Sequence, residues 1–127
     1  MNENEIGTIV VDCAVRLHRD LGPGLLETVY EVILERMFHE AGLKAKRQIP
    51  ISIEYKGIRF NEGFRADLIV NNRVIIELKT VESINKAHKK QVLTYLKLTG
   101  MKLGYLLNFG EAVMKNGIYR IINGIIV

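Results

Sequence analysis

Two acidic residues and one lysine lie in segments that otherwise have the composition of buried β-strands. Asp67 lies in FRADLIV, and Glu77 and Lys79 lie in VIIELKT, two residues apart and therefore on the same side of a strand. A buried charge is costly unless it is paired or holds a metal ion. Two carboxylates suit a hard divalent cation such as Mg²⁺, and an adjacent lysine can orient a water and offset negative charge.

Each of these residues also has an ordinary structural explanation. An isolated acid in a strand usually lies on a solvated face, and a Glu-x-Lys pair on a strand usually forms a surface salt bridge of little energetic value. Glu77 and Lys79 could therefore do no more than pair with other charges. A shared site is favoured because Asp67 and Glu77 flank a turn signal, Asn71-Asn72, so that their side chains can converge.

The register of this hairpin decides whether the two acids meet. A two-residue loop at Asn71-Asn72 would pair Asp67 with Ile76 and send Glu77 to the opposite face. A three-residue loop, 71–73, pairs Asp67 with Glu77 and leaves a continuous apolar surface on the other face. We therefore expect the three-residue loop. The apolar surface that it predicts consists of Leu68, Val70, Val74, Ile76 and Leu78.

Helices are expected on both sides of this hairpin, from apolar residues at helical spacing and from the stop signals that follow them. The expected helices are a first one containing Ile6 to Leu17 and stopped by LGPG at 21–24, a second from about Leu25 to Glu40, and a third from Ser83 or Asn85 to Thr99. Gly42 and Gly100 are the expected C-terminal caps of the last two.

Strands are expected where the apolar period changes to two. They are Ile49–Tyr55, Ile58–Val70, Val74–Lys79, Leu103–Phe109 and Ile118–Ile122. Lys56-Gly57 is typical of a turn, and Gly63 is typical of a bulge within the second strand. The order α-α-β-β-β-α-β-β predicts an α/β fold with a mixed sheet flanked by helices.

Composition sets further bounds. A chain of 127 residues, 48% apolar and 25% charged, predicts one domain over residues 1–127. No apolar stretch is long enough for a membrane span and MNENEIG has no basic signal region, so a cytoplasmic protein is expected. The lone Cys13 excludes an internal disulfide and a cysteine-based zinc cluster, and the three histidines lack metal-ligand spacing. A net charge of +4 is compatible with a polyanionic partner.

Taken together, the motif residues resemble a known superfamily. Asp67 followed by Glu77-Leu78-Lys79, on a hairpin that precedes a helix, is similar to the PD-(D/E)xK nuclease superfamily, whose fold is restriction-endonuclease-like. Ala66 stands where the superfamily name has proline. The sequence QVLTY, with Gln91 and Tyr95 on one helix face, resembles the Gln-x-x-x-Tyr element of its exonuclease-like branch.

A further motif lies upstream. GLLETVY, with Glu27 and Tyr30, resembles the Gly-x-x-Glu-x-x-Tyr signature of a family of small proteins in that superfamily. The resemblance implies that Asp67, Glu77 and Glu27 bind the metal and that Lys79 acts on the attacking water. Gln91 and Tyr95 would orient the site or touch the nucleic-acid backbone.

The function that the resemblance implies is Mg²⁺- or Mn²⁺-dependent hydrolysis of phosphodiester bonds in nucleic acid, with DNA favoured over RNA. The alternative is a catalytically inactive nuclease-fold module that binds nucleic acid or protein. A chain this small has little surface for specificity, so a homodimer or a partner protein could supply it. The lysines of the third helix could contact phosphates or simply form a solvated face; they are Lys86, Lys89, Lys90 and Lys97.

Overall fold

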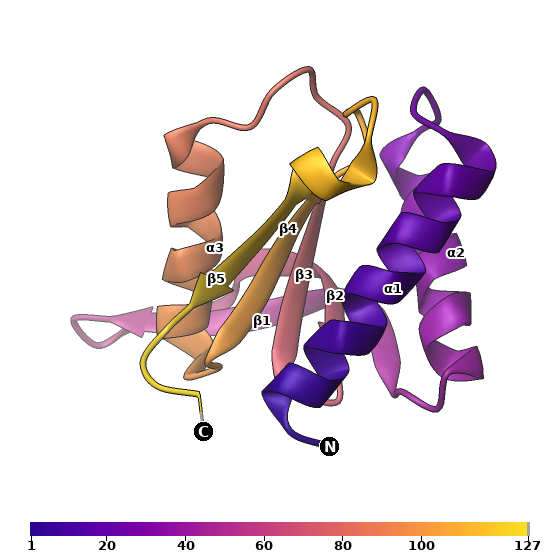
Figure 1. The fold of residues 1–127 in the computed structure, drawn as a ribbon. Helices are drawn as coiled ribbons and strands as arrows, with labels where there is room; N and C mark the ends of the chain where they lie inside the picture. Colours follow the sequence, from indigo (N-terminus) through magenta and orange to yellow (C-terminus); the bar gives the residue numbers. More distant parts are fainter. Residues whose placement is uncertain (127) are drawn as a thin grey trace.

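The computed structural model describes residues 1–126, and Figure 1 shows its fold. The predicted order of helices and strands is confirmed, with one short 3₁₀ helix, η1, that the sequence did not indicate. The elements are α1 (Glu3–Leu21), α2 (Glu27–Glu40), β1 (Ala45–Tyr55), β2 (Ile58–Val70), β3 (Val74–Lys79), α3 (Lys86–Thr99), β4 (Leu103–Asn108), η1 (Met114–Gly117) and β5 (Ile118–Ile122). Within the part described, no helix is both long enough and apolar enough to cross a membrane.

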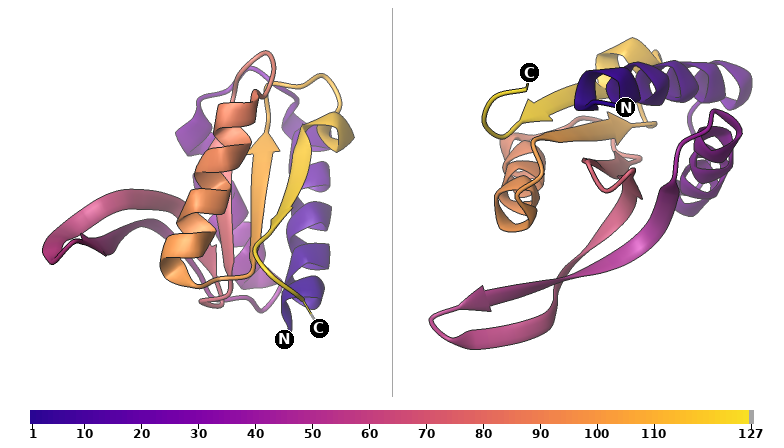
Figure 2. Two further views of the ribbon diagram at one scale, coloured as in Figure 1. Left: turned by 90° about the vertical axis from the view of Figure 1, so that its left-hand side faces the viewer. Right: turned by 90° about the horizontal axis from the view of Figure 1, so that it is seen from below.

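The five strands form one mixed sheet in the order β1-β2-β3-β4-β5. β3 and β4 are parallel and are joined through α3, whereas the other neighbouring pairs are antiparallel. The helices α1 and α2 cover one face of the sheet and α3 covers the other (Figure 2). This is the mixed sheet flanked by helices that the element order predicts, and it agrees with the restriction-endonuclease-like fold that the resemblance implies.

The register of the β2–β3 hairpin is the predicted one. Val70 pairs with Val74, so the loop has three residues, 71–73, and both of its asparagines have positive φ angles, 52° and 53°. Asparagine tolerates this left-handed conformation better than most residues. All five residues of the predicted apolar face are fully buried against α1 and α2, as Leu68, Val70, Val74, Ile76 and Leu78.

Local signals fix the helix ends. Asn85, one of the two expected caps, accepts a hydrogen bond from the His88 amide at 2.9 Å, and Gly100 ends α3 at a φ of 76°. By contrast, α2 begins two residues later than expected, at Glu27. The reason is Tyr30, whose hydroxyl donates to the Gly22 carbonyl at 2.6 Å and accepts from the amide of Leu25, holding the segment before α2 as a loop.

The outer part of the β1–β2 hairpin projects from the body as a two-stranded arm, defined here as residues 49–66 (Figure 2). Lys56-Gly57 forms its two-residue turn, as predicted, with positive φ at both residues. The register shifts between Ile51 and Ile53, so that three residues of β2, including Gly63, stand opposite one residue of β1. The predicted bulge is therefore present.

Where the arm leaves the body, the side chains of the β1–β2 hairpin exchange faces. On β1, Arg47 forms an ion pair with Glu31 of α2, whereas Ile49 packs with the core on the α3 side. Side chains two residues apart in a regular strand share a face. Gln48 between them has a φ of 52°, and this reverses the alternation. Arg47 pairs with Leu68 and Ile49 pairs with Ala66, so Gln48 lies opposite Asp67.

Candidate active site

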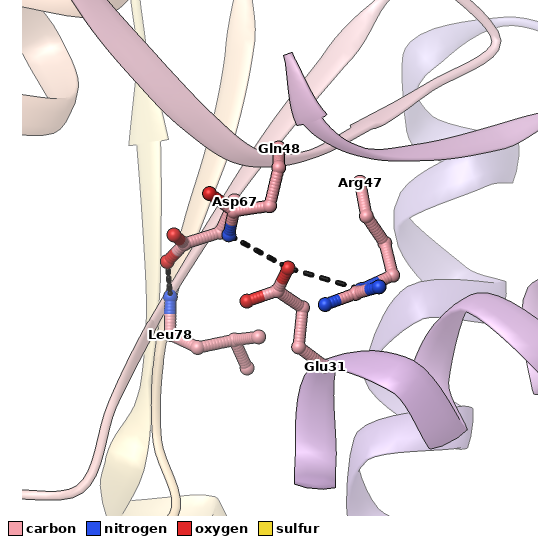
Figure 3. Close-up of polar contacts among 5 residues, drawn as sticks. All are labelled: Glu31, Arg47, Gln48, Asp67 and Leu78. Atoms are coloured by element: carbon pink, nitrogen blue, oxygen red, sulfur yellow. Dashed lines mark hydrogen bonds and ion pairs between the residues drawn. The ribbon is translucent and has the colours of Figure 1, made fainter. Parts of the chain in front are cut away.

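Asp67 and Glu77 are brought together by the register of the β2–β3 hairpin. The pairing of Leu68 with Ile76 places the two acids opposite each other as the next pair along the strands. The amide of Leu78, next to Glu77, donates a hydrogen bond to Asp67 Oδ2 at 2.9 Å (Figure 3). This bond holds the Asp67 carboxylate over β3, so the predicted convergence of the two acids is present.

Glu77 is the most constrained of these groups. The residue is 7% exposed, and its buried Oε1 atom has no hydrogen-bond partner among the described residues. Burial, and secondly the adjacent carboxyl group of Asp67, raise the pKa of Glu77 to about 10. Two carboxylates this close do not both ionise unless a cation neutralises them. Without a cation the pair therefore retains a proton at neutral pH.

A divalent cation fits this donor set. Mg²⁺ is commonly bound through one or two carboxylates and keeps several waters, and a buried unpartnered carboxylate oxygen is a suitable ligand for it. No three His, Cys, Asp or Glu side chains in residues 1–126 form a ready-made metal cluster. The assembled part of the expected site is thus the Asp67–Glu77 pair, and Glu27 as a third ligand stays a prediction.

Glu27 nevertheless lies within electrostatic reach of the pair. Its pKa is raised by burial and, next in size, by the negative charge of Asp67, while the positive charge of Lys79 opposes the shift. Lys79 is half-buried at the end of β3, and its charge also lowers the pKa of Glu77 slightly. The charges of Asp67 and Lys79 are therefore felt at Glu27 in the first turn of α2.

Tyr95 and Gln91 border the Asp67–Glu77 pair from α3. The Tyr95 ring stacks on Phe64 of the arm, with 3.8 Å between ring centroids and 3° between planes. Burial raises the pKa of Tyr95, and the charges of Glu77 and Asp67 raise it further, whereas a hydrogen bond from Gln91 lowers it. Tyr95 thus faces the sheet as expected. Gln91 is exposed, but its side chain reaches the Tyr95 hydroxyl.

The lysines of α3 are exposed, which is compatible with both alternatives considered for them, a solvated face or phosphate contacts. Lys89 has one additional contact: its Nζ lies 4.5 Å from the centroid of the Tyr119 ring on β5. This cation–π contact orients the side chain along the sheet edge. The helix as a whole carries Lys86, Lys89, Lys90 and Lys97 and no acidic residue.

One polar network was not predicted. Glu31, 3% exposed on α2, accepts from Arg47 Nε at 3.1 Å and from Gln48 Nε2 at 2.8 Å. Figure 3 shows these contacts beside Asp67, with the Gln48 amide directed toward Glu31. The only sequence signal for Glu31 was its position four residues after Glu27, which places both acids on one side of α2. Its partners on β1 had no recognisable motif.

With this geometry described, the comparisons with known proteins become informative. Residues 4–121 match the sequence profile of the PD-(D/E)XK nuclease superfamily. The match covers nearly the whole chain, and the chain belongs to this superfamily. No curated protein sequence matches the chain significantly.

A solved structure supports the fold assignment. The crystal structure of SSO0001 aligns with a TM-score of 0.54 at 24% sequence identity, covering 78% of this chain and 51% of that protein. The chain therefore spans about half the length of SSO0001. At this identity the likeness concerns the fold alone.

Proposed function

We propose that the protein is a metal-dependent nuclease that hydrolyses phosphodiester bonds, with DNA favoured over RNA as substrate and Mg²⁺ or Mn²⁺ as cofactor. Membership of the superfamily supports the general class. The observation that carries the proposal is the close pair of Asp67 and Glu77, of which Glu77 has a buried oxygen without a hydrogen-bond partner. A purely structural role for these residues would not require two carboxyl groups to be held close together.

The residues take distinct roles in this proposal. Asp67 and Glu77 hold the cation, and Glu27 completes its coordination from α2, directly or through a water. When bound, a divalent cation activates water and stabilises the charge that develops on the phosphate. Lys79 orients the attacking water and offsets negative charge on the scissile phosphate. Tyr95, held by Gln91 and Phe64, positions the nucleic-acid backbone.

Cleavage assays on labelled single-stranded DNA, duplex DNA and RNA test this proposal. We expect wild-type cleavage with Mg²⁺ or Mn²⁺, and a loss of about 100-fold or more for Asp67→Asn and for Lys79→Ala. Glu62→Gln is the matched control, because Glu62 is an exposed acid on the same strand as Asp67 and forms an ion pair with Arg65. Its activity should equal that of the wild type.

Two outcomes would contradict the proposal. If the wild type binds nucleic acid but cleaves none of the substrates with any of the metals, the protein is an inactive module of the nuclease fold. If cleavage occurs and Asp67→Asn retains it, the hydrolytic site lies elsewhere. Circular dichroism spectra of each variant verify that the loss of activity does not reflect unfolding.

A further inference from the structure

The base of the arm's apolar face packs on the α3 side of the core, where Phe64 stacks on Tyr95, but its outer part has no packing partner among residues 1–126. On β1, Ile51, Ile53 and Tyr55 alternate onto one face, and the residues paired with them on β2 are also apolar. These partners are Phe64, Phe60 and Ile58, respectively. Toward the tip this face is open to solvent: Tyr55 is 68% exposed, Ile58 59% and Phe60 49%. An isolated two-stranded hairpin is marginally stable in water. A ligand or partner that covers this exposed apolar face would therefore stabilise the arm.

Aromatic rings lead from the candidate site onto this face. Tyr95, whose pKa responds to the charges of Glu77 and Asp67, stacks on Phe64. Phe60 and then Tyr55 follow toward the tip on the same face. We name these four rings the aromatic track. The part on the arm runs from Ile51, opposite Phe64, to Tyr55 on β1, which is four residue steps or about 13 Å at 3.3 Å per step.

The reversal at Gln48 decides which side of the molecule the track faces. Because the ribbon turns over there, the apolar face of the arm opens on the α3 side of the sheet, which is also the side of Ile75 and Glu77. Without this reversal the same residues would face α2. A chain that extends from the candidate site along the α3 side therefore meets the aromatic rings.

Charge determines which kind of chain fits. α3, which meets the arm through Tyr95, carries exposed lysines and no acidic residue. Lys89 lies against Tyr119 at the opposite edge of the sheet, which leaves Lys86, Lys90 and Lys97. Lys86 and Lys90 lie in the first turns of α3, where a positive charge opposes the helix dipole rather than stabilising the helix. At the tip, Lys56 Nζ lies 5.6 Å from the centroid of the Tyr55 ring. Basic groups beside exposed aromatic rings suit a polyanion with flat, stackable bases.

We propose that the aromatic track binds the bases of single-stranded nucleic acid next to the catalytic groups, while Lys86, Lys90 and Lys97 of α3 contact its phosphates. This inference rests on the proposed function, because it names the form of the substrate of the same site. Bases must be unstacked from a duplex partner to lie on protein rings. The arm thereby selects a single strand, a frayed end or a flap over an intact duplex.

Binding without metal tests the inference separately from cleavage. The probe is a fluorescently labelled oligothymidylate of about 20 nucleotides, longer than the roughly 4–16 nucleotides that a single small domain covers. Its affinity is measured by anisotropy in EDTA for the wild type, for Tyr55→Leu/Phe60→Leu and for Tyr55→Phe/Phe60→Tyr. The leucine pair keeps apolar bulk and removes the rings, whereas the second pair keeps both rings.

We expect the leucine pair to bind the oligothymidylate about tenfold more weakly for each ring lost, and the ring-preserving pair to bind like the wild type. Ile58→Ala removes an exposed aliphatic side chain from the same face and should leave affinity unchanged within about twofold. A duplex of equal length should bind the wild type more weakly than the single strand. Loss of oligothymidylate binding with unchanged folding, judged by circular dichroism, supports the inference.

Other outcomes overturn it. If the leucine pair binds as tightly as the wild type, or if duplex binds more tightly than the single strand, the rings of the arm are not a stacking surface for bases. If sedimentation velocity shows a dimer that both Ile58→Ala and the leucine pair dissociate, a second copy of the chain covers this face instead. An inactive wild type that still binds through its rings would contradict the nuclease proposal and leave the binding surface intact.

Discussion

The two consecutive hairpins of the sheet, β1–β2 and β2–β3, differ in how deeply they are buried. The β2–β3 hairpin is buried on both faces, and its register places Asp67 opposite Glu77. The arm of the β1–β2 hairpin is buried only at its base, and its outer apolar face is exposed. Burial on both faces fixes register tightly, since a slip of one residue exchanges every inward and outward side chain.

This difference in burial indicates which hairpin contributes to the stability of the fold. The β2–β3 hairpin holds two ionisable groups at a fixed separation, and that requires a rigid surround. The arm contributes little to the core and instead presents rings to solvent. Its geometry is set locally, by the two-residue turn and by the bulge at Gly63, rather than by packing on both sides.

The largest contrast should come from matched isoleucine truncations. Ile76→Ala, at a fully buried position of β3, should lower the free energy of unfolding by about 2–5 kcal/mol. Ile58→Ala, at a position 59% exposed on the arm, should change it by no more than about 0.5 kcal/mol. Urea denaturation monitored by circular dichroism gives both values. Equal destabilisation would show that the arm is part of the cooperative core.

A second contrast concerns pH. The pKa of Glu77 lies at about 10 in the folded protein, above its ordinary value, so the folded state keeps a proton that the unfolded chain releases. This contribution is fully present below the ordinary pKa and is lost as pH rises toward the folded value. In EDTA, the unfolding free energy should fall by up to about 1.4 kcal/mol per pH unit between about pH 5.5 and 9.

Two variants isolate the source of this slope. Glu77→Gln replaces the titrating carboxyl group by an amide that does not ionise. Its unfolding free energy should therefore depend less on pH than that of the wild type and should be higher at the alkaline end. Glu54→Gln, at an exposed acid of the arm, should follow the wild-type profile. Adding Mg²⁺ should restore wild-type stability at alkaline pH, because the cation replaces the proton. Parallel profiles for wild type and Glu77→Gln would refute the shifted pKa.

The smallest contrast lies in the turns. Gly57 has a φ of 77°, so Gly57→Ala should cost about 1–2 kcal/mol through left-handed backbone strain. Asn72 has a φ of 53°, and Asn72→Gly should change stability by less than about 1 kcal/mol, because both residues tolerate this conformation. Thermal unfolding resolves the two effects. A larger loss of stability for Asn72→Gly than for Gly57→Ala would contradict this prediction.

Much of the fold could be predicted because its signals are local. Asn85 and Gly100 mark the ends of α3, Lys56-Gly57 marks the tip of the arm, and Gly63 marks its bulge. The register at 71–73 was predictable for another reason: only one choice satisfies both the acidic face and the apolar face of β2 and β3.

The features that were missed depend on contacts between distant segments. Nothing in the sequence marks Gln48 as a residue with positive φ, since glutamine rarely adopts this conformation. The reversal of the ribbon was therefore unpredictable, and so was the contact of Gln48 with Glu31. The later start of α2 had the same origin, because it depends on the Tyr30 hydroxyl reaching back to Gly22.

The position of the ribbon reversal bears on how such a protein can diversify. The pairs on either side of Gln48 keep one register, and everything beyond them up to the tip belongs to the arm. Residues inserted or deleted in matched numbers on its two strands would change its reach without shifting Asp67 relative to Glu77. The length of the arm can therefore vary among descendants of this sequence while the relative positions of Asp67 and Glu77 at its base are inherited unchanged.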